Sequence, residues 1–224
     1  NVTTGKYDPD NTMKYDQNDF EMICNEVTDS NCLAIRVDDD RYSDWDSFAA
    51  YWKQAGSLIT SASGLGITSD DATADMLVAN DLGVDVDIIA SGGSGDNVTF
   101  LLNGTTDFLM GNVSEMVAAH NDGQFKILCV FAEERDSNLP DVPTYEELTG
   151  NLVVGCSSRG YAMLKDVPDD IKQILGDAVK AAVQDPDLIE QLNAIYTTTD
   201  YKEGQEYVDY MNQQQQQARE TWGV

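Results

Sequence analysis

The sequence is poor in the residues on which most catalytic and metal sites depend. It contains one histidine, His120, and four cysteines, none of them in a C-x-x-C pair. His120 stands at the end of a predicted helix, where an imidazole faces the helix C-terminus favourably, so we expect a structural role for it. No G-x-S-x-G sequence is present to hold a hydrolase nucleophile. We therefore predict no catalytic residue, no metal site and no cofactor.

The four cysteines leave one alternative open. Cys24 and Cys32 are close enough in sequence to bridge a helix end to the following strand, and the sequence does not decide whether they form a disulfide. Cys129 and Cys156 lie in apolar, strand-like runs, so we expect both to behave as buried small hydrophobic residues.

Basic residues are also scarce, and long apolar runs are absent. The chain has 13 lysines and arginines against 40 aspartates and glutamates, and its net charge is −27. Such a chain repels phosphates, so we exclude nucleic acid as a partner. No apolar run reaches the roughly 18 residues of a membrane span. The first residues, up to Asp19, show no signal peptide, as expected of a mature or truncated chain. The run Asp38–Asp40 is interpreted as a solvated turn.

Strands and helices alternate along most of the chain. This alternation indicates an α/β protein whose parallel or mixed sheet is covered on both faces. Strands are predicted at 32–37, 58–60, 86–89, 107–110, 127–131 and 152–155. Helices are predicted at 20–27, 43–54, 70–81, 96–103, 114–120 and 145–148, from Pro168, from Pro186, and over 204–222.

Two segments rich in glycine and serine follow neighbouring strands and open helices. They are 61–69 and 91–95. The carboxyl ends of strands are where open α/β sheets bind ligands, and helix N-termini there suit a carboxylate or phosphate. Thr68 and Ser69 add hydroxyl donors, and Gly64 and Gly66 permit a close approach to the backbone. An ordinary strand-to-helix turn is the alternative for each loop. No lysine follows the glycines as in a Walker sequence, so nucleotide binding is disfavoured.

Several blocks resemble the receptors of tripartite tricarboxylate transporters. The most specific are FKILCVFAEER (125–135) and LPDVPTYEEL (139–148); LLNGTTD (101–107), SSRG (157–160) and VPDDI (167–171) accompany them. The resemblance covers most of the chain from about Phe20. One position departs from the pattern, because the residue after Ser69, often histidine in the family, is Asp70 here.

The resemblance implies a two-lobed fold like that of type II periplasmic binding proteins, with mixed or parallel sheets and a hinge. Residues 1–55 would form part of lobe 1, residues 56–152 lobe 2, and residues 153–224 the return to lobe 1. The hinge would lie near Gly56 and near Val153–Gly155. The family's opening βα units would precede Asn1, which leaves lobe 1 incomplete in this sequence.

The resemblance also implies a function and a site. The chain would be an extracytoplasmic receptor, periplasmic or lipid-anchored, that binds a small carboxylate or amino acid and delivers it to membrane permease subunits. It would not be an enzyme. The ligand contacts expected in lobe 2 are Ser63, Gly64, Gly66, Thr68, Ser69, Ser91, Gly92, Gly93, Ser94 and Asn112.

Other hypotheses stay open beside this one. The chain could sense a ligand for a membrane signalling partner, or be a truncated receptor that binds nothing. An intracellular enzyme with a rewired cleft is the weakest alternative, because no base, nucleophile or metal set supports it. An incomplete lobe 1 would expose strand edges, so self-association is a further expectation.

Overall fold

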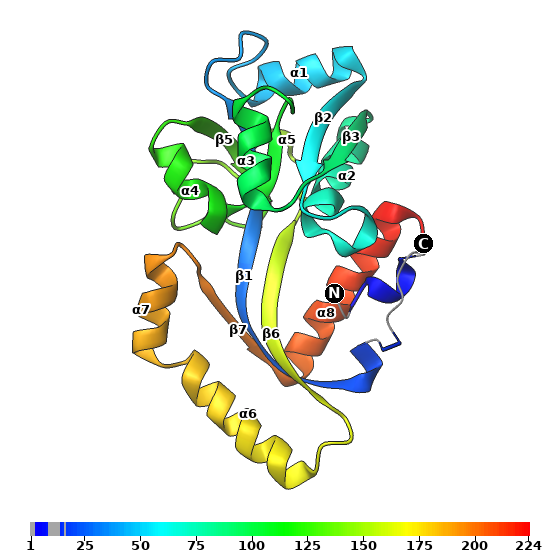
Figure 1. The fold of residues 1–224 in the computed structure, drawn as a ribbon, viewed down its shortest axis with the longest axis vertical. Coiled ribbons are helices and arrows are strands. Elements are labelled where there is room, and N and C mark those ends of the chain that lie inside the picture. Colours follow the sequence, from blue (N-terminus) through cyan, green and yellow to red (C-terminus); the bar gives the residue numbers. More distant parts are fainter. Residues whose placement is uncertain (1–2, 9–13, 16) are drawn as a thin grey trace. The chain divides into compact units, whose positions relative to one another are not determined.

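A computed structural model describes residues 3–8, 14–15 and 17–224, which form two compact units (Figure 1). Unit 1 comprises Asn1–Asp29 and Ser158–Val224, and unit 2 comprises Ser30–Ser157. The prediction placed the first boundary after residue 55, but residues 30–55 belong to unit 2. Gly56, one of the predicted hinge positions, caps a helix inside unit 2, because its amide donates to the Trp52 carbonyl (2.9 Å).

The sheet of unit 2 is built around the second half of strand β1 (Phe20–Arg36). Strands β4 (Leu109–Asn112) and β5 (Phe125–Val130) pair with it on either side, both antiparallel. Strands β2 (Ser57–Ala62) and β3 (Asp85–Ala90) form a parallel pair. The Asp107 amide, just before β4, donates to the Ile59 carbonyl of β2 (2.7 Å), which brings the two groups of strands together.

Helices cover both faces of this sheet, as the alternating pattern predicts. Helices α1 (Trp45–Ala55), α2 (Asp70–Leu82) and α5 (Tyr145–Thr149) pack into one core with Phe108 and Met110. Helices α3 (Ser94–Leu102) and α4 (Val113–Asn121) pack into a second core with Leu109 and Phe125. Their ends match local signals: Asp44, Ser69 and Thr144 cap the starts of α1, α2 and α5, and Gly56, Gly83 and Gly150 follow the ends of the same helices.

The acidic run after β1 is a turn, as predicted, but its central aspartate, Asp39, is buried between two arginines. The guanidinium of Arg41 donates to both carboxylate oxygens of Asp39 (2.9 and 2.7 Å) and to Asp107 (2.5 Å). Arg36 also donates to Asp39, whose side chain is 3% exposed. The hydrogen bonds from Arg41 lower the pKa of Asp39 to about 2. Asp38 and Asp40 are open to solvent, as predicted.

Two secondary-structure predictions were wrong. Residues 20–27, predicted as a helix, form the first half of β1, where Cys24 pairs with Glu203 of a distant strand. Residues 152–155, predicted as a strand, are irregular, although Gly155 exchanges backbone hydrogen bonds with Asn31 and Phe131 (2.8 and 3.0 Å). In both places the partner strands, which lie far away in sequence, override the local pattern.

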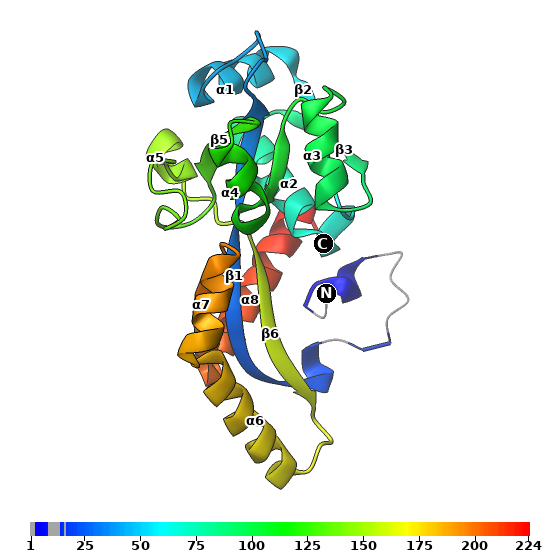
Figure 2. The same cartoon turned by 60° about the vertical axis from the view of Figure 1, so that its left-hand side comes forward.

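Unit 1 contains the first half of β1, flanked by β6 (Cys156–Leu164) and β7 (Thr199–Glu203). Figure 2 shows β6 running beside β1. The unit also contains three helices, α6 (Asp169–Val183), α7 (Pro186–Ala194) and α8 (Gly204–Trp222). Two short 3-10 turns, Gly5–Tyr7 and Gln17–Asp19, precede β1. Gly160 of the SSRG block touches β1, since a Cβ there would overlap the Cys24 carbonyl and the Tyr207 hydroxyl. That contact explains a glycine at this position.

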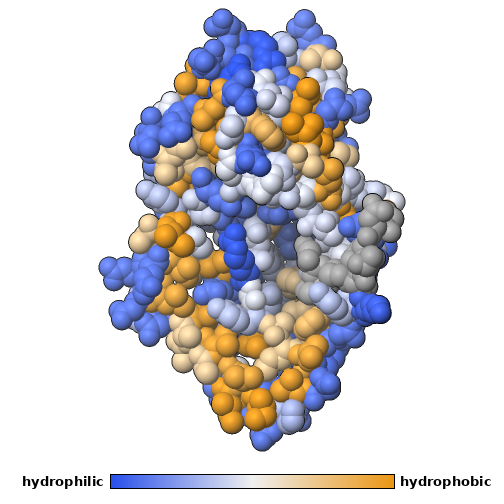
Figure 3. Space-filling view, in the orientation of Figure 1, coloured by the Kyte–Doolittle hydropathy of each residue, from blue (hydrophilic) through white to orange (hydrophobic). Residues whose placement is uncertain are grey.

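Large apolar side chains remain exposed in unit 1. Leu164 at the end of β6 is 52% exposed, and Ile174 of α6 is 64% exposed. Ile171 and Leu175, which share a helix face with Ile174, are also exposed. Figure 3 shows apolar residues gathered over this part of unit 1, in the lower part of the view.

The structure contains no disulfide among its cysteines. Cys24 and Cys32 lie in the same strand and form no disulfide, because eight residues of extended chain hold them well beyond bridging distance. Cys129 is fully buried as predicted, whereas Cys156 is half-buried. In the described residues, no helix combines the length and the apolar character that crossing a membrane requires.

Candidate ligand-binding site

The candidate site lies where β2 and β3 end side by side. Ala62, the last residue of β2, is paired with Ala90, the last residue of β3. The Ser91 amide then donates to the Ala62 carbonyl (3.0 Å), so the two loops leave the sheet next to each other. The structure therefore brings both predicted glycine- and serine-rich loops to one edge of unit 2.

The first loop leads into the N-terminus of α2 and supplies its cap. Ser63 is exposed, and Gly66 (φ +77°) begins a 3-10 turn that includes Thr68. Ser69 caps α2: its hydroxyl oxygen accepts from the Ala72 amide (3.2 Å), which leaves the hydroxyl proton available to a ligand. Gly64 approaches Ser69, because a Cβ there would lie 3.6 Å from the Ser69 Cβ.

The second loop leads into the N-terminus of α3. One of its amide donors is already bonded to a carboxylate of α3. Gly93 (φ +141°) caps the helix without a side chain, and a residue with a Cβ would be strained there. The Gly92 amide donates to the Asp96 carboxylate (3.0 Å), and a Cβ on Gly92 would lie 2.6 Å from the same oxygen. The Ser91 hydroxyl is within 3.4 Å of the Gly93 amide. The amides of Ser94 and Gly95, in the first turn of α3, have no acceptor within the helix.

Asn112 is linked to the first loop through Asn31, which the sequence analysis did not predict as a site residue. It is buried at the end of β4 and lies directly opposite Asn31 of β1. Residues directly opposite in an antiparallel pair share one face of the sheet. The side-chain amide of Asn31 donates to the carboxylate of Asp71 in the first turn of α2 (3.1 Å). Asn112, Asn31 and Asp71 thus belong to the face that α2 covers.

Asp75 lies one turn further along α2, in the protein interior. Its side chain is 0% exposed, and neither carboxylate oxygen has a hydrogen-bond partner. Burial, together with the nearby Asp71, raises the pKa of Asp75 well above its ordinary value. The charged form is costly in such surroundings, so burial favours the protonated, neutral form of Asp75.

Sequence reasoning missed Asn31, Asp71, Asp75 and Asp96. One signal was present: Asp71, Asp75 and Val78 fall on a single face of the predicted helix, so an acid stood among apolar positions. Asn31 carried no signal, since its role depends on the pairing of β1 with β4. His120 has the expected structural role, because its Nδ1 accepts from the Ile127 amide (3.2 Å).

No group suited to a metal ion was found in the part of the chain that the structure describes. There, no three or more histidine, cysteine, aspartate and glutamate side chains come together in an arrangement that could hold a metal. The chemistry that the loops offer is hydrogen bonding from hydroxyl groups and backbone amides.

Comparison with known proteins identifies the family. Residues 3–221 match the tripartite tricarboxylate transporter family receptor. The chain belongs to this family. Its members are solute-binding proteins. A curated relative from Agrobacterium vitis, the UPF0065 protein in the TAR-I ttuE-ttuC′ intergenic region, is 28% identical over 154 residues. That alignment covers 68% of this chain and 43% of the relative, so the matched segment is less than half the relative's length.

Several solved structures have the same fold as this chain. A TctC solute-binding protein from Polaromonas is 25% identical with a TM-score of 0.77, over 93% of this chain and 71% of that one. MatC from Rhodopseudomonas palustris, with bound malate, is 22% identical with a TM-score of 0.75, over 95% and 72%. Rpa4515 from R. palustris, with adipate, is 19% identical with a TM-score of 0.79, over 95% and 72%. The predicted α/β fold of the periplasmic-binding-protein type is therefore confirmed for this receptor.

Proposed function

We propose that this chain is an extracytoplasmic receptor that captures a small carboxylate at the ends of β2 and β3. It then delivers the solute to the membrane subunits of a tripartite tricarboxylate transporter. The observation that carries the proposal is the pair of adjacent strands, each of which ends in a glycine- and serine-rich loop and opens a helix. Helix N-termini and hydroxyl donors at the carboxyl ends of strands suit a carboxylate.

The relatives support a carboxylate ligand and a location outside the cytoplasm. MatC holds malate and Rpa4515 holds adipate in structures with the fold of this chain. The structure of BugD, with a TM-score of 0.74, is that of a periplasmic binding protein. We place this receptor likewise in the periplasm, free or anchored to the cell surface by a lipid.

Replacing Ser69 with alanine should weaken ligand binding by roughly 10–150-fold. The variant loses a hydroxyl donor to a charged group, and such a hydrogen bond contributes about 1.5–3 kcal/mol. The measurement is the rise in melting temperature with increasing carboxylate. At 100 times the dissociation constant, a ligand adds about 2.7 kcal/mol to the free energy of unfolding. A tenfold weaker ligand at the same concentration adds about 1.4 kcal/mol.

A matched variant separates binding from helix capping. Thr144 caps α5 as Ser69 caps α2, and its hydroxyl accepts from the Glu147 amide (3.1 Å). Thr144→Ala and Ser69→Ala should each lower the melting temperature without ligand, since each loses a cap worth about 1 kcal/mol. Only Ser69→Ala should reduce the ligand-induced rise. An equal ligand response in both variants would contradict the site.

For unit 1, we propose that two copies of the chain associate through β6 and α6. Among the described residues, the one strand that pairs with β6 is β1, so the other edge of β6 is open to a second strand. Leu164 ends β6, and Ile174 and Leu175 lie in α6, the next element of the chain. Their exposed side chains would be covered by the second copy. The net charge of −27 opposes the association of two copies at low salt.

The association should therefore strengthen as salt rises. Light scattering after gel filtration is expected to show a larger dimer fraction at roughly 0.5 M than at roughly 0.02 M salt, because the repulsion is screened. Ile174→Glu should keep the chain monomeric at both, whereas Gln184→Glu, with the same added charge at the end of α6, should dimerise like the parent. A monomer at every salt concentration would contradict this proposal.

A further inference from the structure

The segment that carries the ligand loops is strongly acidic and has almost no cation of its own. Between Gln54 and Phe125 the chain has no lysine or arginine, and it has ten aspartates and glutamates. One described ion pair reaches this segment, that of Asp107 with Arg41. Arg41 and Asp107 lie at the other end of the strands, beside the start of β4. This segment therefore offers no side-chain cation of its own to a negatively charged ligand at the loops.

Carboxylates also stand at both helix ends of the site. Asp70 and Asp71 are the first two residues of α2, directly after Ser69. Asp96 lies in the first turn of α3 and already accepts the Gly92 amide. These acids compensate the positive ends of the helix dipoles that would otherwise attract an anion. One ligand carboxylate can still use the hydroxyl groups of the first loop, but a second one would meet acidic neighbours.

Buried acceptors without a hydrogen-bond partner are a separate observation at the same end of unit 2. They are Oδ2 of Asp70, the amide oxygens of Asn31 and Asn97, and the one oxygen of Asp75 that carries no proton when this acid is neutral. Asn31 and Asp75 are 0% exposed and Asn97 is 2% exposed. In a helix a side chain leans toward the N-terminus, so Asp75 is directed back to the first turn of α2, where Asp71 and Asp70 lie. The hydroxyls of Thr60 and Ser61 and the proton of neutral Asp75 offer three donors against these four acceptors, so this end of the unit still has acceptors in excess.

We propose that the ligand presents an ammonium group to Asp70 in the first turn of α2, and that it is an amino acid or a similar amino-carboxylate. This inference rests on the proposed function, since it concerns the same site. The ligand's carboxylate is held by the hydroxyl and amide donors of the loops, and its ammonium donates to the Asp70 carboxylate. Such a ligand satisfies the excess of acceptors, whereas a plain di- or tricarboxylate adds further acceptors to it.

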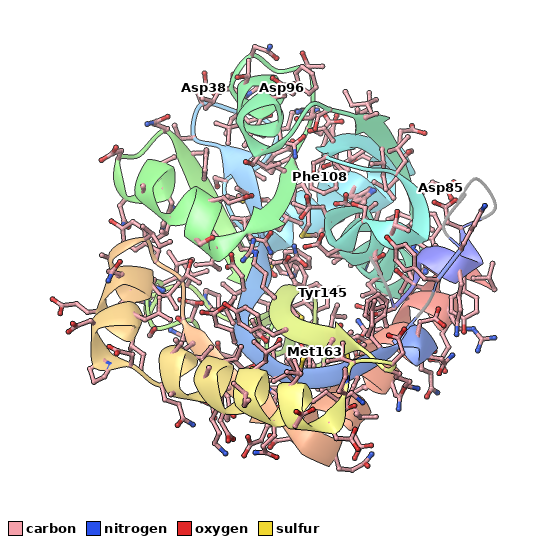
Figure 4. All side chains as sticks on the ribbon, turned by 60° about the horizontal axis from the view of Figure 1, so that its bottom comes forward. Asp38, Asp85, Asp96, Phe108, Tyr145 and Met163 are labelled. Atoms are coloured by element: carbon pink, nitrogen blue, oxygen red, sulfur yellow. The ribbon has the colours of Figure 1, made fainter. Side chains whose placement is uncertain are left out.

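Pairs of acids that differ by one α-ammonium test the inference on the full chain. They are succinate and L-aspartate, glutarate and L-glutamate, and propionate and L-alanine. Isothermal titration calorimetry should show that the member with the ammonium binds at least about tenfold more tightly, as expected for a charge-assisted hydrogen bond. Asp70→Asn should reduce that preference to about twofold or less. Asp85→Asn, which makes the same change on an exposed residue at the start of β3 (Figure 4), should leave it intact.

The outcomes distinguish the inference from the function on which it rests. Tighter binding of the acids without an ammonium would overturn the inference and leave the carboxylate receptor in place. A preference for the ammonium that persists in Asp70→Asn would remove Asp70 from the proposal. Binding of none of the six acids, by a chain whose circular dichroism shows it to be folded, would overturn the proposed function together with the inference.

Discussion

Replacing Phe108 with alanine is expected to lower the free energy of unfolding of unit 2 by about 3–5 kcal/mol. Phe108 is 0% exposed and lies inside unit 2 (Figure 4). Its ring centroid is 4.8 Å from that of Trp52 and 5.6 Å from that of Phe48. The substitution removes both aromatic contacts and leaves a cavity beneath α1, next to the strand that ends at Asn112.

Urea unfolding followed by tryptophan fluorescence measures this loss, because Trp45 and Trp52 both belong to the affected core. Phe100→Ala is the matched control: Phe100 lies on α3 and is only half-buried, so the same deletion should cost clearly less there. A cost below about 1 kcal/mol for Phe108→Ala would mean that the core refills the space, in conflict with the packing described.

Replacing Asp75 with asparagine should stabilise unit 2 increasingly as the pH rises. The pKa of Asp75 is raised in the folded state, by burial first and by Asp71 second. Between the ordinary pKa, near 4, and the raised one, the folded state holds a proton that the unfolded state has released. The free energy of unfolding of the parent therefore falls with rising pH in that interval, by up to about 1.4 kcal/mol per pH unit. Asparagine is neutral throughout and escapes this loss.

The measurement is the difference in the free energy of unfolding between Asp75→Asn and the parent, from about pH 4 to pH 8. It should be small at the acidic end, where Asp75 is protonated in both states, and should grow toward pH 8. Val78→Ala provides the control, because this buried neighbour on α2 has no titratable group and its cost should not depend on pH. A difference for Asp75→Asn that is equally flat would contradict the raised pKa.

The candidate site shows how far local patterns reach. The two loops lie at the predicted positions in the structure. Gly66 and Gly93 adopt positive φ angles and Ser69 caps α2, and both effects act within a few residues along the chain. The fact that the loops adjoin follows from the pairing of β2 with β3, which the alternation of strands and helices also predicts. The role of each residue in ligand binding stays a prediction.

The acidic groups beneath the loops could not be predicted in the same way. The contact between Asn31 and Asp71 joins residues that lie 40 positions apart. Asp96 covers the Gly92 amide because α3 begins immediately after a glycine with an unusual backbone conformation. In a chain with 40 acidic residues, composition alone does not indicate which carboxylates are buried. That depends on which elements pack together.

The sequence by itself determined the helices from α1 to α8, the absence of a C-x-x-C or G-x-S-x-G motif, the family, and the two loops of the candidate site. These features depend on neighbours along the chain, such as caps, turn residues and helical spacing. Only the tertiary structure decided that β1 runs from Phe20 to Arg36, that Cys24 and Cys32 form no disulfide, and that Asp75 is buried. The first half of β1 is a strand because of antiparallel pairs such as that of Cys24 with Glu203 of β7. Pairing over such separations leaves no local trace in the sequence.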